Sequence, residues 1–212
     1  YQKNKSNLDE KAKAPIYAEL KSLRAYYYYR LLDMFGNVPI VTDFENLDLP
    51  EQSTRKEVYD FVEKELKESL PLLNTNVVYS KMTKNVAYAL LARLYLNSEA
   101  FIGTPRWQDC LDMCQKISGY TLAPDYFTNF SQQNQTSPEI IFAIPYDSKA
   151  GTVGNYMSSM SAHYLHKLTL SPTGNYPWSG NGMAAQPGVY SSFSETDKRK
   201  GTMLIGDQIN LA

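Results

Sequence analysis

Apolar residues recur at helical spacing through the first half of the chain, and they predict four helices before residue 120. We expect the first helix to run from about Ile16 to Phe35, because Gly36 and Pro39 follow as residues that end helices. The apolar positions of this helix form one stripe, which we expect to face the core: Leu20, Leu23, Tyr27, Leu31 and Met34.

Four consecutive tyrosines, Tyr26 to Tyr29, lie within this first helix. Successive helical residues are turned by about 100°, so the four rings point to nearly all sides of the axis. A helix inside a layered stack touches neighbours on several sides. We therefore expect these rings mainly to pack, with their hydroxyls reaching water or backbone, and contact with a ligand is the secondary alternative.

The remaining three helices are marked by their ends. The second is expected to open at Thr54, where Glu57 completes a capping-box pattern, and to end at Pro71. The third is expected over about 83–101, and the fourth from near Pro105 to Gly119. Helices of this length joined by short links are typical of antiparallel hairpins packed side by side. We therefore predict a mainly α fold with tetratricopeptide-like helix hairpins.

The character of the sequence changes after Gly119. The run from Glu139 to Ile144 is bracketed by prolines and predicts one strand. From Asp147 onward, Gly, Ser, Asn, Pro and aromatic residues dominate; irregular stretches of such length are usually functional or disordered, and the aromatics argue against disorder. We therefore expect a helical region over 1–119 and an irregular, loop-rich, ligand-binding region with a few short strands over 120–212, packed on the first as one domain.

Charge and composition narrow the function. The 212 residues include 21 Lys and Arg against 22 Asp and Glu, a net charge of -1 that offers no general attraction for nucleic acid or anionic lipid. The 17 tyrosines outnumber the 8 phenylalanines and 2 tryptophans, which favours half-wet surfaces and contacts with polar ligands. No apolar run approaches the roughly 20 residues of a membrane span. The composition thus gives no reason to expect binding to nucleic acid or to a membrane, and it favours contacts with polar ligands.

Candidate metal and redox residues are few. Cys110 and Cys114 share one helix face with Trp107, so we expect both cysteines to pack as small hydrophobes. His163 and His166 are spaced to share a metal on a helix, but no third ligand lies near them in the sequence, and we expect loop histidines without a metal. We therefore expect neither a metal nor a cofactor.

Catalytic patterns are also weak. The segment from Gly180 to Ala185 matches G-x-G-x-x-A, but Pro177 lies where the preceding strand of a dinucleotide site is needed. Acidic pairs such as Asp43 and Glu45 have no cleft assigned to them, so they give no reason to expect a glycoside hydrolase. We therefore predict no catalytic residues and no enzyme activity.

The segment from Ser171 to Pro187 holds the strongest candidate binding residues. It places Tyr176 and Trp178, together with Asn175 and Asn181, on a loop punctuated by Gly and Pro. An aromatic ring covers the apolar C–H face of a sugar, and amide groups bond its hydroxyls. These four residues therefore predict a glycan contact; the alternative is that the rings hold the loop onto the core.

Several motifs occur in an order that resembles one known family. They are "LRAYYYYRLLDMFGNVPIV", "TKNVAYALLARLYLN", "YTLAPDYFTNF", "SPEIIFAIPYD" and "NGMAAQPGVYSSFSETDKRKGT". In this order they are similar to the signatures of the SusD/RagB proteins, outer-membrane lipoproteins of Bacteroidetes. The resemblance implies helix pairs of tetratricopeptide type beside a loop-rich face, and it runs over nearly the whole chain.

The resemblance also implies a function. Such proteins capture nutrients, usually glycans, at the cell surface without catalysis, and they act as a lid on a SusC-like TonB-dependent transporter. Family members are about twice as long as this chain and carry a lipid anchor, so we expect a fragment that lacks the C-terminal half and whose only link to the membrane, the anchor, is missing. The alternative function is a tetratricopeptide-type module that binds protein or peptide.

Overall fold

The computed structural model describes residues 9–43, 45–46, 48–131, 133–145, 160 and 182–203. Backbone contacts divide the chain into two units, Tyr1–Ile144 and Pro145–Ala212. The predicted division after residue 119, and the packing of both parts as one domain, stay predictions.

Helix α1 (Glu10–Phe35) begins earlier than its apolar pattern predicts. The side chain of Asp9 accepts a hydrogen bond from the backbone N–H of Ala12 at 2.7 Å, so the cap lies upstream of Pro15, which falls inside the helix. The predicted end is confirmed: Gly36 has a φ of 72°, and its N–H donates to the carbonyl of Leu32 at 3.0 Å.

The next helices follow their predicted caps closely. Helix α2 (Arg55–Ser69) opens with the complete capping box of Thr54 and Glu57 and runs into a 3₁₀ turn, η1 (Leu70–Leu72). Helix α3 (Lys84–Leu96) is capped by Thr83, and α5 (Trp107–Lys116) is the predicted fourth helix, shorter at both ends. The expected single helix over 83–101 is wrong in one respect, because it breaks at Asn97 and continues as α4 (Ser98–Ile102).

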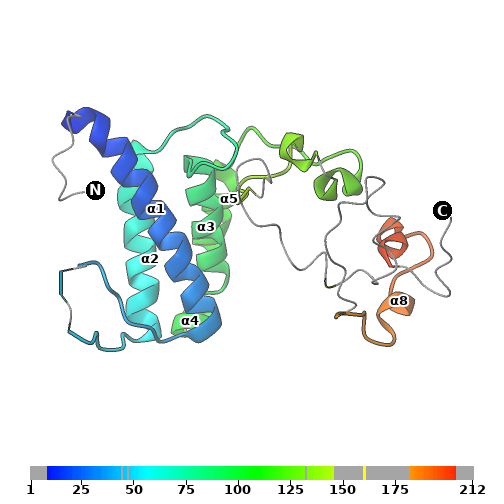
Figure 1. Ribbon diagram of the computed structural model, residues 1–212, viewed down its shortest axis with the longest axis horizontal. Coiled ribbons are helices and arrows are strands. Elements are labelled where there is room, and N and C mark those ends of the chain that lie inside the picture. The colour runs from blue at the N-terminus through cyan, green and yellow to red at the C-terminus, as the bar shows by residue number, and fades with distance from the viewer. Residues whose placement is uncertain are drawn as a thin grey trace. The chain divides into compact units, whose positions relative to one another are not determined.

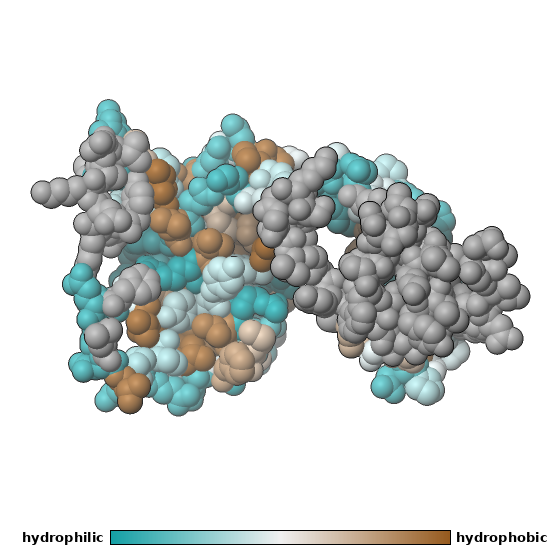
Figure 2. All heavy atoms as spheres, in the orientation of Figure 1, coloured by the Kyte–Doolittle hydropathy of each residue, from teal (hydrophilic) through white to brown (hydrophobic). Residues whose placement is uncertain are grey.

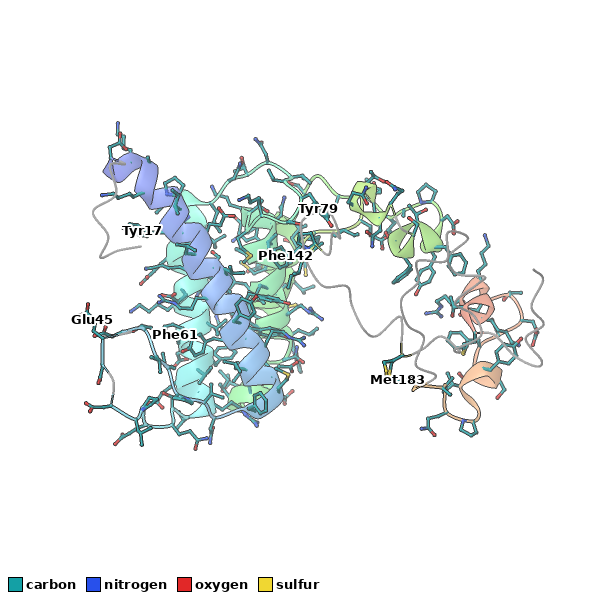
Figure 3. All side chains as sticks on the ribbon, viewed as in Figure 1. Tyr17, Glu45, Phe61, Tyr79, Phe142 and Met183 are labelled. Carbon is teal, nitrogen blue, oxygen red and sulfur yellow. The ribbon has the colours of Figure 1, made fainter. Side chains whose placement is uncertain are left out.

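These helices form a bundle in which α1 packs mainly on α2, and α3 packs mainly on α5 (Figure 1). The mainly α fold is confirmed in the described part of the chain. Side chains fill the space between the ribbons (Figure 3). The largest fully buried residues come from three of the helices: Leu32, Tyr59, Leu66, Leu91, Leu94 and Tyr95. Ala87 and Ala92 are buried as well, and their small side chains let neighbouring helices approach α3.

The face of α1 that meets the core is not the predicted one. The buried residues are Ala18, Ser22, Ala25, Tyr29 and Leu32. In the predicted stripe, Leu20, Tyr27 and Met34 are 47%, 54% and 56% exposed. The small residues on the buried face allow α2 to lie close, and this packing outweighs the gain from burying the larger side chains. Apolar and polar side chains consequently mix on the outer face where α1 lies (Figure 2).

The tyrosine run is divided among these surroundings. Tyr29 is buried, Tyr26 and Tyr28 are partly buried against the core, and Tyr27 faces outward. The Tyr28 ring meets Phe61 edge-on at 4.9 Å, and its hydroxyl accepts from the N–H of Val41 at 2.8 Å and donates to the Val41 carbonyl at 3.3 Å. The expected packing role is confirmed for three of the four rings.

The predicted strand from Glu139 to Ile144 is wrong. These residues are turn and irregular backbone, and the described residues contain no β-strand, only an isolated antiparallel bridge between Val38 and Ser53. A strand needs a partner, and this segment is held instead by its turn: the backbone carbonyl of Pro138 accepts from Thr121 at 3.2 Å. Before it come two 3₁₀ turns, η2 (Tyr126–Phe130) and η3 (Asn134–Thr136).

Within residues 182–203 the second unit contains one short helix, α8 (Val189–Ser192), and one 3₁₀ turn, η6 (Lys198–Thr202). Gly188 precedes α8 with a φ of 90°. The irregular character predicted for this region matches its described residues. Among the helices that the structure describes, none is both long and apolar enough to cross a membrane.

Candidate functional site

The four predicted glycan-binding residues, Asn175, Tyr176, Trp178 and Asn181, lie outside the described residues, as do His163 and His166. Their glycan-contacting role stays a prediction. The structure does describe the segment that follows them directly. This segment, 182–203, shows how the loop is anchored at its downstream end.

The anchor is formed by Gly182 and Met183, whose N–H groups both donate to the carbonyl of Met160, at 2.8 and 3.0 Å (Figure 3). A Cβ on Gly182 would lie 2.1 Å from the Cε of Met160. Only glycine permits this approach without a shift of the methionine side chain. Gly182, which directly follows Asn181, is therefore held to Met160, more than twenty positions upstream.

Beyond the anchor, cations lie over aromatic rings. The ammonium of Lys200 lies 4.6 Å from the ring centre of Tyr190 and pairs with Glu195. The guanidinium of Arg199 lies 5.5 Å from the Phe193 ring. Arg199 also donates to Asp197 from its backbone and side chain, and these hydrogen bonds lower the pKa of Asp197 to about 2. A cation thus lies over one face of the Tyr190 ring and another over one face of the Phe193 ring. Asp197 is held as an anion.

A second aromatic cluster, which the sequence analysis did not single out, lies on η2 in the first unit. The rings of Tyr126 and Phe130 are 5.0 Å apart, those of Tyr126 and Phe127 are 5.5 Å apart, and all three are exposed. The signal was present in the sequence as three rings within "YFTNF". Exposed rings of this kind can cover the C–H face of a sugar, so η2 is an additional candidate surface.

A hydrogen-bonded support lies behind this aromatic cluster. The side-chain amide of Asn129 donates to Glu139 at 2.6 Å, and the backbone N–H of Ala123 donates to the same carboxylate oxygen at 3.1 Å. The hydroxyl of Ser137 donates to the Asn129 side chain at 2.5 Å. The hydrogen bonds from Asn129 and from Ala123 lower the pKa of Glu139, and the Asn129 bond has the larger effect. Glu139 therefore serves as a charged brace that holds η2 to the turn at 137–139.

The described acids are poorly suited to proton transfer. Every described carboxyl group with a shifted pKa has it lowered: Glu57, Glu63, Glu68, Glu139 and Asp197. A general acid in glycoside cleavage needs a raised pKa so that it holds a proton near neutral pH. These five carboxyl groups are anions near neutral pH, and they act as hydrogen-bond acceptors.

Glu63 lies within the helical bundle and accepts hydrogen bonds from three side chains. Burial alone would raise its pKa, but hydrogen bonds from Arg106, Lys67 and Tyr95 outweigh burial and lower the pKa to about 2. The Arg106 guanidinium lies 2.8 Å from Glu63 and 4.1 Å from the centre of the Tyr95 ring. Burial and the bond to Glu63 both raise the pKa of Tyr95. This cluster joins three helices and is a structural element of the fold.

The cysteine prediction is half right. Cys110 is partly buried and packs against the core, as does Met113, whereas Cys114 is exposed. Burial is the first cause that raises the pKa of the Cys110 thiol. Within the described ranges, no three His, Cys, Asp or Glu side chains come together as a metal site would require.

Comparison with known proteins identifies the fold. A family model of SusD-like proteins, described as "Starch-binding associating with outer membrane", matches residues 2–96. The starch-binding protein SusD of Bacteroides thetaiotaomicron is 30% identical over 138 residues, which make up 61% of this chain and 25% of that protein. The chain is thus similar to SusD-like proteins.

Solved structures extend the likeness over nearly all of the chain. The surface glycan-binding protein A of Bacteroides uniformis matches with a TM-score of 0.75 and 21% identity, over 97% of this chain and 46% of that one. The protein of the same name from Bacteroides thetaiotaomicron, in complex with laminarihexaose, matches with a TM-score of 0.70 and 23% identity, over 92% and 43%. The chain thus spans less than half the length of these relatives.

Proposed function

We propose that this chain takes part in binding a glycan at the bacterial outer membrane, without transforming it. The observation that carries the proposal is a relative of the same fold, similar over 92% of this chain, whose structure was determined with laminarihexaose bound. The name of the family and that of its starch-binding member support the same class of ligand.

The proposed glycan contact is the aromatic loop with Tyr176 and Trp178, flanked by Asn175 and Asn181. A ring face for the C–H side of the sugar and amides for its hydroxyls are the groups that such a ligand requires. The bonds from Gly182 and Met183 to Met160 support this assignment, since they hold the residues on either side of this segment together before a ligand arrives.

Binding without catalysis is supported by the described acids. Those with shifted pKa values are all held as anions, and none of these has the raised pKa of a general acid. The proposed role is capture of the glycan and its delivery to a SusC-like TonB-dependent transporter, with a lipid anchor as the link to the membrane.

Calorimetry with laminarin and with starch tests the binding. We expect saturable heat with at least one of the two glucans, and no release of reducing ends during incubation. Absence of binding to both, in protein that is folded by circular dichroism, would overturn the proposal for this chain. Release of reducing sugar would overturn its non-catalytic part. Delivery is tested separately, by asking whether the protein co-purifies with a SusC-like barrel.

A further inference from the structure

A methionine side chain covers the glycine of the anchor. The sulfur of Met160 lies 3.2 Å, and its methyl carbon 2.1 Å, from the position that a Cβ on Gly182 would take. The thioether therefore lies directly against the backbone of Gly182, in the space that the missing side chain of glycine leaves open.

The covered backbone carries the hydrogen bonds of the anchor. The N–H groups of Gly182 and Met183 both donate to the carbonyl of Met160, at 2.8 and 3.0 Å. An apolar group beside a hydrogen bond lowers the local dielectric and keeps water from competing for the donor and the acceptor. The side chain of Met160 therefore shields the bonds that its own carbonyl accepts.

Met160 is open to small oxidants. The residue is partly exposed, and a thioether that solvent reaches can be oxidised to the sulfoxide. With hydrogen peroxide as the oxidant, one S–O bond forms while the O–O bond of the peroxide breaks. The sulfur loses two electrons, the peroxide is reduced, and one molecule of water leaves.

The sulfoxide does not suit the place that the thioether occupies. Oxidation converts a flexible apolar side chain into a polar one. A sulfoxide oxygen pressed against the backbone carbon of Gly182 gives up hydrogen bonds to water, which is unfavourable. The oxidised side chain is therefore expected to turn toward solvent, and the two hydrogen bonds of the anchor then meet competing water.

We propose that the anchor is a redox-sensitive clasp, in which oxidation of Met160 uncovers the hydrogen bonds and loosens the chain at Gly182. The consequence for glycan binding rests on the proposed function. Tyr176 and Trp178 of the proposed contact lie in the sequence between Met160 and Gly182. When their flanking residues are held less firmly, more entropy is lost on binding, so oxidation lowers the affinity for the glycan. Reduction of the sulfoxide reverses the change.

Amide hydrogen exchange tests the clasp without any glycan. After mild treatment with hydrogen peroxide, we expect exchange at the Gly182 and Met183 amides to become roughly fivefold faster or more. Met160→Leu keeps an apolar cover without sulfur, so peroxide should not change its exchange. Met183→Leu is the matched control, because Met183 is 41% exposed and only its backbone takes part in the bonds; it should stay sensitive. Unchanged exchange in the treated wild type, or equal acceleration in Met160→Leu, would overturn the proposal.

Calorimetry with the glucan that binds the untreated protein tests the consequence for binding. We expect peroxide to lower the affinity of the wild type and of Met183→Leu several-fold, and to leave that of Met160→Leu unchanged. Treatment of the oxidised wild type with methionine sulfoxide reductases should restore binding. An equal loss in Met160→Leu would break the link between Met160 and the glycan. If the untreated protein binds no glucan, the proposed function fails, whereas the exchange experiment still decides whether the clasp is redox-sensitive.

Discussion

The carboxylate of Glu63 on α2 and the guanidinium of Arg106, at the start of α5, lie 2.8 Å apart. The hydroxyl of Tyr95 on α3 donates to the same carboxylate at 2.8 Å, and its ring lies under the guanidinium. One ion pair thus joins three helices of the bundle. Because the Glu63 side chain is only 15% exposed, water competes weakly for these bonds.

Replacing Glu63 by Gln should weaken the bundle. The variant keeps the shape but loses the charge that Arg106 and Lys67 bind, and we expect the free energy of unfolding to fall by about 2 kcal/mol. Urea denaturation measures this loss. Glu68→Gln is the control, since its pair with Lys21 is open to solvent and should contribute less than about 1 kcal/mol. Equal losses in both variants would show that the cluster has no special role.

The same carboxylate predicts a pH dependence. The pKa of Glu63 is about 2 in the folded chain against an ordinary 4.5, so the unfolded state binds the proton more readily. The contribution of Glu63 to the free energy of unfolding is complete when the pH lies above the ordinary pKa of 4.5, and it is lost as the pH falls toward about 2. Denaturation midpoints of the wild type and Glu63→Gln should therefore converge over this interval. A gap that stays constant with pH would contradict the assignment.

Gly36→Ala tests the end of α1. Gly36 has a φ of 72°, and an added Cβ would lie 2.7 Å from Nη2 of Arg55, whose guanidinium also donates to the carbonyl of Ala100. Gly103→Ala is a close control, because its φ is 71° and nothing lies within 4 Å of the new carbon. We expect a loss of about 1 kcal/mol for Gly103→Ala from backbone strain alone, and a larger one for Gly36→Ala. Thermal denaturation of both compares them; an equal loss would exclude the crowding by Arg55.

Tyr28→Phe removes a hydroxyl that bonds both backbone groups of Val41. The ring contact with Phe61 is kept, so we expect a loss of about 1 kcal/mol and faster hydrogen exchange at the Val41 amide. Tyr27→Phe is the comparison, since Tyr27 is 54% exposed and the bonds to Val41 are those of Tyr28. Unchanged protection of the Val41 amide in Tyr28→Phe would contradict the predicted role of the hydroxyl.

Trp178→Ala should weaken glucan binding by roughly 5- to 30-fold, because a ring stacked on a sugar contributes on the order of 1–2 kcal/mol. The chain offers one other tryptophan as a control, Trp107, which is 58% exposed on α5. Trp107→Ala should leave the affinity unchanged. Calorimetry with the glucan that binds the wild type measures both, and similar losses in the two variants would remove Trp178 from the proposed contact.

The end of α1 and the start of α2 were predictable because their causes are local. Thr54 and Glu57 meet across three residues, and Gly36 adopts a conformation that its own lack of a side chain permits. The face that α1 turns to the core was not predictable in this way. Both of its faces are apolar, and the choice depends on how closely α2 can approach Ala18 and Ala25.

Features that depend on distant partners escaped the sequence pattern. The run from Glu139 to Ile144 reads as a strand, but no described segment pairs with it, and Glu139 is bound instead by Asn129 and Ala123. The ring cluster on η2 was visible as three aromatics in five residues. Its exposure depends on the turn that holds it, which no local rule supplies.

The segment from 42 to 51 is tied at both of its ends. The hydroxyl of Tyr28 holds Val41 on one side, and on the other the Gln52 amide donates to the Asn37 carbonyl at 3.0 Å, beside the Val38 and Ser53 bridge. Its two ends are therefore kept in place by residues that do not belong to it. Additional sequence, such as a peptide epitope or a labelling tag, can be inserted between them with only a small cost in chain entropy, because closure of the longer loop is already provided by these ties.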